Sequence, residues 1–149
     1  MEKYYDGKNW LDLDKDYIGI EEYYLNNKLH RENGPSIIWY YNNGNIEIEK
    51  YYQNGKRHRE NGTAEIWYYN NGNIEQEQYY QNGKRHREDG PSIIWYTYNK
   101  YTYEHLIGYK KYYLKDKIIS KQKIKEIGID TNNIPFTKSD IIKFKLTFG

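Results

Sequence analysis

The chain has 149 residues, enough for one domain or a short repeat array, and its lack of cysteine excludes disulfides and thiolate metal sites. No stretch approaches the roughly 20 apolar residues that cross a bilayer, so no membrane insertion is expected. Residues 1–10 are polar and lack the apolar core of a signal peptide, and we therefore expect a cytoplasmic protein.

The formal net charge of +2 is distributed unevenly along the chain. Residues 1–21 hold three Lys and six acids, residues 22–98 hold nine basic and ten acidic residues, and residues 99–149 hold eleven Lys and five acids. The last segment, with a net +6, can attract nucleic acid, although a solvated basic face is the simpler interpretation. The 20 tyrosines suit half-buried sheet faces, because each ring is apolar and its tip is polar.

Residues 1–21 are interpreted as an N-terminal cap or degenerate unit, because residues 4–8 (YYDGK) weakly match a motif that recurs later. The acidic residues 12–16 resemble the start of a calcium loop, but they lack the glycine and the terminal Glu that such a loop needs. No metal and no cofactor are therefore expected.

A 28-residue unit repeats through residues 22–98. Residues 23–50 and 51–78 are identical at 20 of 28 positions, and a third copy starts at Tyr79 and then degrades. Atypical end copies are what a repeat array needs, because its terminal units must face water.

Each unit contains two strand-like runs, such as residues 46–53 and 63–69, with Asn-Gly pairs that favour tight hairpin turns. No crossover helix fits between the runs, so we expect the strands to pair in antiparallel. The sequence predicts a mainly β protein. Its repeated β-hairpins would form an antiparallel meander and a twisted single sheet, followed by a small mixed α/β cap over residues 99–149.

Alternation along the strands assigns the side chains to faces. One face of the second strand carries a small residue, an isoleucine and a tyrosine, whereas the other face carries a tryptophan. The isoleucines are Ile38, Ile66 and Ile94, and the tryptophans are Trp39, Trp67 and Trp95. We predict that the isoleucine face forms the core and that the tryptophan face is half-exposed or covered by another segment.

The unit formed by residues 51–62 (YYQNGKRHRENG) and 66–72 (IWYYNNG) resembles the MORN-repeat variant, especially the tandem copies of giant DNA viruses of amoebae and of some bacteria and phages. The resemblance covers about residues 22–98. It implies a sheet of successive hairpins and an interaction role, often labelled antitoxin-like in bacteria, and it supplies no catalytic residue. Standard members have Gly after the His, where this chain has Arg31, Arg59 and Arg87, so their lipid-binding role is not carried over.

The His-Arg-Glu triplets at residues 30–32, 58–60 and 86–88 invite a metal or catalytic interpretation. Equivalent residues of a meander lie two strand spacings apart, roughly 10 Å, so the three histidines cannot reach one ion. We expect each triplet to fix its own loop through charge-assisted hydrogen bonds. The sequence also lacks a phosphate loop and a nucleophile elbow, and no enzyme activity is expected.

The segment 99–149 is rich in Lys and less regular. Ser120 is a candidate N-cap for a short helix over residues 121–126 that ends at Gly128. Four apolar residues alternate with polar ones and predict a final strand: Ile142, Phe144, Leu146 and Phe148. We expect this segment to cap the open end of the sheet, with a basic module that docks an acidic partner as the alternative.

The evenly spaced tryptophans carry the functional hypothesis. Aromatic side chains in a row on one sheet face can bind a partner's side chains or stack on bases, with simple packing as the alternative role. The predicted binding residues are Trp39, Trp67 and Trp95, with Tyr51 and Tyr79 on the same side or close by.

The expected function is a non-enzymatic scaffold for a protein partner. The resemblance would make it a viral or phage factor that captures a host component in the host cytoplasm, or an antitoxin-like protein. The alternative is a nucleic-acid-binding protein that uses the basic C-terminal segment and the aromatic face. Exposed strand edges would also allow a homodimer.

Overall fold

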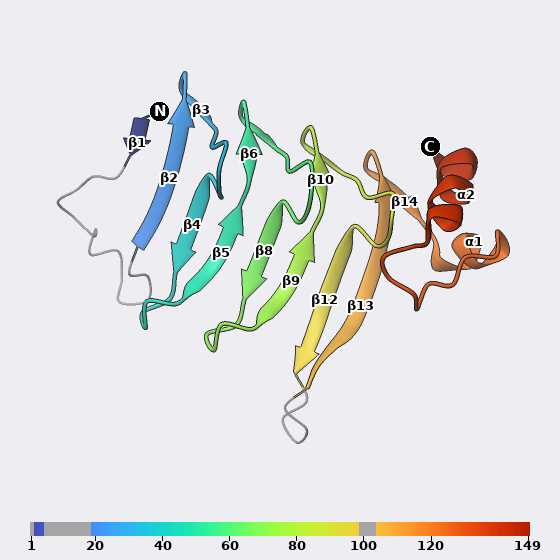
Figure 1. Ribbon diagram of the computed structural model, residues 1–149. Helices are drawn as coiled ribbons and strands as arrows, with labels where there is room; N and C mark the ends of the chain where they lie inside the picture. Colours follow the sequence, from blue (N-terminus) through green and yellow to red (C-terminus); the bar gives the residue numbers. More distant parts are fainter. Residues whose placement is uncertain (1, 5–18, 99–103) are drawn as a thin grey trace.

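The strands form one open antiparallel sheet, and two short helices lie at its C-terminal end (Figure 1). The computed structural model describes residues 2–4, 19–98 and 104–149, so the acidic residues 12–16 and most of the weak copy at 4–8 lie outside the described residues. Neighbouring strands follow one another along the chain, as in a meander. The predicted mainly β fold with a small C-terminal cap is confirmed.

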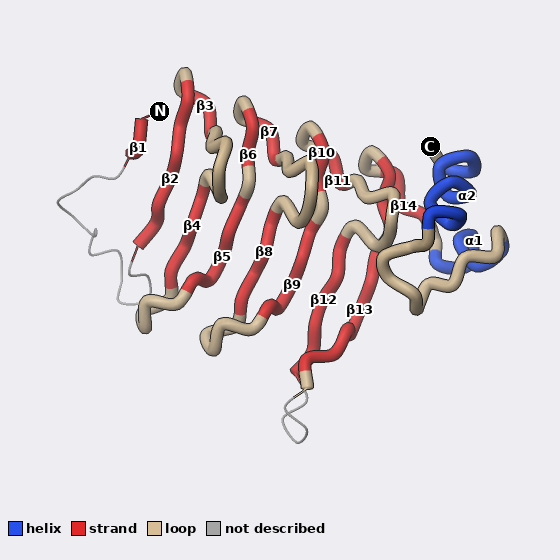
Figure 2. The backbone as a smooth tube through the Cα atoms, viewed as in Figure 1, coloured by secondary structure: helices blue, strands red, loops and turns tan. Residues whose placement is uncertain are grey.

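The strands that build the sheet are β1 (Glu2–Tyr4), β2 (Gly19–Leu25), β3 (Lys28–Leu29), β4 (Ile37–Tyr40), β5 (Ile46–Lys50), β8 (Glu65–Tyr68), β9 (Ile74–Gln78), β12 (Ile93–Tyr98), β13 (His105–Leu114) and β14 (Lys117–Ile119). Two short hairpins project from one edge (Figure 2): β6 (Tyr52–Gln53) with β7 (Lys56–Arg57), and β10 (Tyr80–Gln81) with β11 (Lys84–Arg85). The helices are α1 (Lys121–Glu126) and α2 (Lys138–Phe148).

The Asn-Gly pairs form tight turns, as the sequence predicts. Between β6 and β7, Asn54 has a φ of 50° and Gly55 a φ of 78°. Two successive positive φ angles suit the twist of a hairpin, and Asn and Gly adopt them at little cost.

The strand register assigns the two faces, because cross-strand partners point to the same side of a sheet. One face, called the Trp face below, carries two rows: Trp39, Ile48, Trp67, Gln76, Trp95 and Tyr109, and beside it Ile37, Lys50, Glu65, Gln78, Ile93 and Lys111. The opposite Ile face carries Ile38, Glu49, Ile66, Glu77, Ile94 and Lys110.

Both faces bury isoleucine, so the prediction of a core on the Ile face alone is wrong. On the Ile face, Ile38, Ile66 and Ile94 are 3–9% exposed. On the Trp face, Ile37, Ile48 and Ile93 are equally buried, at 8%, 0% and 4%. A single sheet has no second layer, so long aromatic side chains of the same face must cover the short ones.

Tyrosine–glutamate pairs repeat along the Ile face. The hydroxyl of Tyr40 donates to Glu21 at 2.9 Å, that of Tyr68 to Glu49 at 2.8 Å, and that of Tyr96 to Glu77 at 2.6 Å. Burial, followed by the hydrogen bond to the carboxylate, raises the pKa of Tyr40 to about 12, and the pKa of each of the other two tyrosines is raised by the same causes.

The sheet is therefore expected to lose stability between pH 10 and pH 12. A tyrosine whose pKa is higher in the folded than in the unfolded chain stabilises the fold fully below the unfolded value of 10.0, and this contribution is lost as the pH rises through about 12 for Tyr40. Urea unfolding followed across this pH range measures the loss. Tyr40→Phe removes one ionisable group and should reduce the pH dependence, whereas an equal slope in both proteins would contradict the assignment.

The helix over residues 121–126 is confirmed, with Ser120 as its N-cap and a left-handed Gly128 after its end. The predicted strand over residues 142–148 is wrong, because this stretch lies in α2. Thr137 begins α2 with a capping box in which its side chain and that of Asp140 bond each other's backbone amides.

The helices pack on the β13–β14 hairpin and complete the cap. A buried cluster joins them, formed by Tyr112, Leu114, Ile124, Ile129, Phe136 and Phe144. Phe144 is fully buried and contacts the rings of Phe136 and Phe148, with centroids 5.6 and 5.2 Å away. The cap thus has a small hydrophobic core of its own at the end of the sheet (Figure 1).

Candidate functional site

The three tryptophans lie in one row across the Trp face. All three are half-buried, and Trp95 packs against Tyr109 of the next strand with ring centroids 5.1 Å apart. One strand separates Trp39 from Trp67, and one separates Trp67 from Trp95, so successive indoles lie two strand spacings apart, roughly 10 Å.

Lysines of the neighbouring row lie over these rings. The Nζ atom of Lys50 is 4.8 Å from the ring centroid of Trp39 and 5.8 Å from that of Trp67, so one ammonium serves two indoles. The Nζ atom of Lys111 is 5.6 Å from the ring centroids of both Trp95 and Tyr109. Both lysines therefore make cation–π contacts within the Trp face.

The middle unit replaces this pattern with a polar cluster. Gln76 stands where the first unit has Ile48, and Gln78 stands where the first unit has Lys50. The Nε2 of Gln78 donates to Gln76 at 2.9 Å, and its Oε1 accepts from the hydroxyl of Tyr80 at 2.9 Å. The amide is thus held close to the sheet.

A buried carboxylate completes the cluster. Glu65, which is 4% exposed, accepts a 2.8 Å hydrogen bond from the indole Nε1 of Trp67. Its second oxygen lies 2.5 Å from Nη1 of Arg57. The burial penalty of the carboxylate is offset by these two charge-assisted contacts, which also fix the orientation of the indole.

Arginines and tyrosines alternate beside this cluster. The guanidinium carbon of Arg57 is 4.7 Å from the ring centroid of Tyr80 and 5.6 Å from that of Tyr52. Arg85 has the same arrangement in the third unit, 5.6 Å from Tyr80 and 5.7 Å from Tyr113. At the position of Glu65, however, the third unit has an isoleucine.

Tyr51 and Tyr79 do not lie with the tryptophans, and that part of the prediction is wrong. The backbone amide of Tyr51 donates to Ala64 O and that of Tyr79 to Ser92 O, both at 2.8 Å, which continues the register of the Ile face. There the guanidinium carbons of an arginine pair, Arg59 and Arg87, lie 3.9 Å from the ring centroids of these tyrosines. Both tyrosines therefore take part in loop packing on the opposite side of the sheet.

Comparisons with protein-family models, curated proteins and solved structures found no match for the chain. The site is therefore interpreted from its own geometry. Neither helix of the described residues has the length and apolar character that crossing a membrane requires. Within the same residues, no three His, Asp or Glu side chains are grouped as ligands for a metal ion.

The histidines of the three triplets connect successive units. Nδ1 of His30 accepts from the backbone amide of Asn54 at 3.1 Å, and Nδ1 of His58 accepts from that of Asn82 at 3.1 Å. His86 makes the same contact, at 3.3 Å, to the amide of Lys115 in the cap. Each imidazole thus holds the next turn in place, which is the structural role expected from the sequence.

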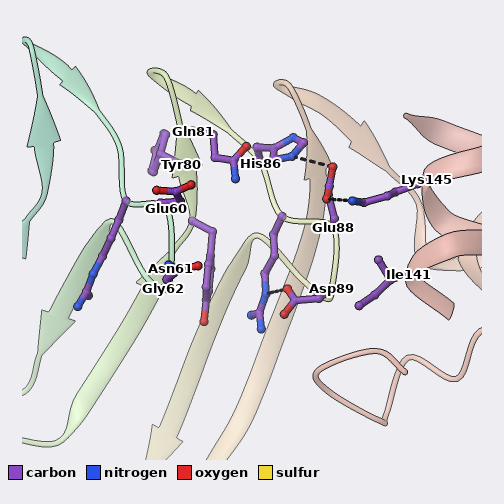
Figure 3. Close-up of a pocket in the computed structure, with 13 residues that line it drawn as sticks. Glu60, Asn61, Gly62, Tyr80, Gln81, His86, Glu88, Asp89, Ile141 and Lys145 are labelled. Atoms are coloured by element: carbon purple, nitrogen blue, oxygen red, sulfur yellow. Dashed lines mark hydrogen bonds and ion pairs between the residues drawn. The ribbon is translucent and has the colours of Figure 1, made fainter. Parts of the chain in front are cut away.

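A cavity of about 450 Å³ lies between the third unit and α2 (Figure 3). Glu88 bridges its two walls, because its carboxylate lies 3.5 Å from Nε2 of His86 and 2.5 Å from Nζ of Lys145. Beside it, Nε of Arg87 bonds Asp89 at 2.6 Å. These charged groups are already paired across the cavity, and the pairs dock α2 against the sheet.

Sequence reasoning missed Lys50, Lys111 and the polar cluster as parts of the site. The signal was present in the unit alignment, where residues 23–50 and 51–78 differ at eight positions. Four of these eight substitutions create the contacting residues Arg57, Glu65, Gln76 and Gln78. The register between strands was needed to see that they meet.

Proposed function

We propose that the protein is a non-enzymatic scaffold that binds a protein partner through the Trp face. The observation that carries this proposal is the row of three half-buried indoles on one side of a single-layer sheet. Tryptophan is enriched among residues that dominate binding energy at protein interfaces. The resemblance of the unit to the MORN-repeat variant points the same way, toward a cytoplasmic partner, which is a host protein if the chain is viral.

Partner capture with matched variants tests the proposal. The protein and a Trp39→Ala, Trp67→Ala, Trp95→Ala variant would be used as baits in the same lysate, with bound proteins identified by mass spectrometry. Loss of one central tryptophan costs about 2 kcal/mol or more at an interface, roughly a 30-fold loss of affinity. The triple variant should therefore retain none of the proteins that the wild type enriches.

The control variant is Tyr51→Ala with Tyr79→Ala, which truncates aromatic rings on the Ile face. It should keep the captured partner, provided that circular dichroism shows a folded sheet in both variants. Equal capture by the wild type and the folded tryptophan variant would refute the proposal. Loss of capture in the tyrosine variant alone would assign the binding to the other face.

The second candidate function is binding of single-stranded nucleic acid. It is favoured by the cations of Lys50 and Lys111 beside the indoles and by the net +6 of residues 99–149. Aromatic stacking combined with basic side chains is the usual mode of such proteins, and their affinity falls steeply with salt. Fluorescence anisotropy of a labelled oligonucleotide at low and high salt measures this, and absence of binding at low salt would exclude it.

A further inference from the structure

The first unit shows how the Trp face accommodates a cation. The ammonium of Lys50 lies within cation–π distance of two successive indoles, Trp39 and Trp67. Lys50 is the cross-strand partner of Ile37 in β4, two residues before Trp39. In the third unit, Lys111 is the cross-strand partner of Ile93 and lies over Trp95 in the same way.

The middle unit has the aromatic rings of this arrangement but not its cation. Gln78 occupies the position of Lys50 and Lys111, because it is the cross-strand partner of both Glu65 and Ile93. Its side chain is shorter, uncharged and bonded to Gln76 and Tyr80. Of the described residues, the register thus places only glutamines between the β9-facing sides of Trp67 and Trp95.

The neighbouring charge favours a cation in this place. The carboxylate of Glu65 is held at the indole nitrogen of Trp67 and lies beside Gln78 in the register. The indole faces add the negative side of their quadrupoles. A phosphate would meet this carboxylate, whereas an ammonium or guanidinium would meet two π faces and amide groups.

We propose that the space between Trp67 and Trp95, called the cation slot below, receives a Lys or Arg side chain of the protein partner. The inference rests on the proposed scaffold function and specifies the chemistry of its partner. The partner's cation would take the position that Lys50 takes between Trp39 and Trp67.

The test uses two short peptides as probes, acetyl-Gly-Lys-Gly-amide and the neutral acetyl-Gly-Gln-Gly-amide, at constant ionic strength. The indole Nε1–H signals of the full chain are followed by NMR, which detects weak binding. The signals of Trp67 and Trp95 should shift saturably with the lysine peptide and should stay in place with the glutamine peptide. Absence of a saturable shift, or equal shifts with both peptides, would overturn the proposal.

Two variants use the sequence differences between the units. Gln78→Lys supplies an internal cation, as Lys50 and Lys111 do, and should weaken lysine-peptide binding at least tenfold. Lys50→Gln removes the internal cation of the first unit and should create a second site, seen as a new saturable shift of Trp39. If Gln78→Lys binds the peptide as well as the wild type does, or Lys50→Gln gains no shift of Trp39, the proposal is wrong.

The outcome is separable from that of the scaffold proposal. A partner whose capture depends on the tryptophans but not on Gln78→Lys would leave the scaffold function standing and would overturn the cation slot. A lysine peptide that binds the slot without any captured partner would support the slot chemistry and count against the scaffold function.

Discussion

Replacement of Phe144 by alanine is expected to unfold most of the C-terminal cap. Phe144 is fully buried at the centre of the cap cluster and contacts two further phenylalanine rings. Truncation of a buried Phe costs about 3–5 kcal/mol, which is comparable to the total stability of a small core. The helical circular dichroism signal and the protection of residues 112–148 from hydrogen exchange should both be lost.

The matched control is Leu146→Ala in the same helix. Leu146 is 84% exposed, so its truncation should change the free energy of unfolding by no more than about 0.5 kcal/mol. The comparison also tests the helix itself, because in the alternating strand predicted from the sequence Phe144 and Leu146 would point to the same side. Equal destabilisation by the two substitutions would contradict the packing of α2.

Removal of Arg57 is expected to cost far more than removal of its partner Glu65. Arg57→Leu leaves a carboxylate that is 4% exposed without its guanidinium, and breaking a buried ion pair in this way costs about 3–5 kcal/mol. Glu65→Ile leaves an arginine between Tyr52 and Tyr80, the environment that Arg85 has naturally beside Ile93. Urea unfolding of both single variants measures the asymmetry.

The double variant Arg57→Leu, Glu65→Ile recreates the residues that the first unit has at these positions, Leu29 and Ile37. It should recover most of the stability lost in Arg57→Leu, because a buried ion pair is often replaced by apolar residues without loss. Effects of the two substitutions that simply add would show that the pair is not coupled, contrary to its 2.5 Å separation.

The meander was predictable from sequence because its signals are local. Asn54 and Gly55 specify a turn with two positive φ angles, and the alternation of Ile66, Trp67 and Tyr68 marks a strand with two different faces. Ser120 likewise identified the start of α1. In each case a few adjacent residues contain the information that determines the structure.

The final helix was missed because a period of two and a period near four coincide in a short apolar stretch. Ile142 and Leu146 completed the apparent alternation, yet both are exposed, at 59% and 84%. The side chains that pack are Ile141, Phe144 and Phe148, spaced as one side of a helix. The Thr137–Asp140 capping box was the overlooked signal.

The candidate site was predictable only in part, because the face of one strand relative to the next depends on register. The tryptophan row follows from the repeat alone. The position of Tyr51 does not, since a bulge between Trp39 and Tyr40 and the pairing with Ala64 together place it on the Ile face. Nor does composition reveal that Glu65 and Arg57 meet, because they come from different strands.

The histidine links have an evolutionary consequence. His30 holds the turn of the second unit exactly as His58 holds that of the third, so each unit presents the same donor and acceptor to its successor. Unequal recombination between the gene segments encoding residues 23–50 and 51–78 would therefore lengthen or shorten the protein by whole units without breaking a link. The reach of the tryptophan row would change in steps of roughly 10 Å, which lets a lineage adjust the span of its partner surface without redesigning either end.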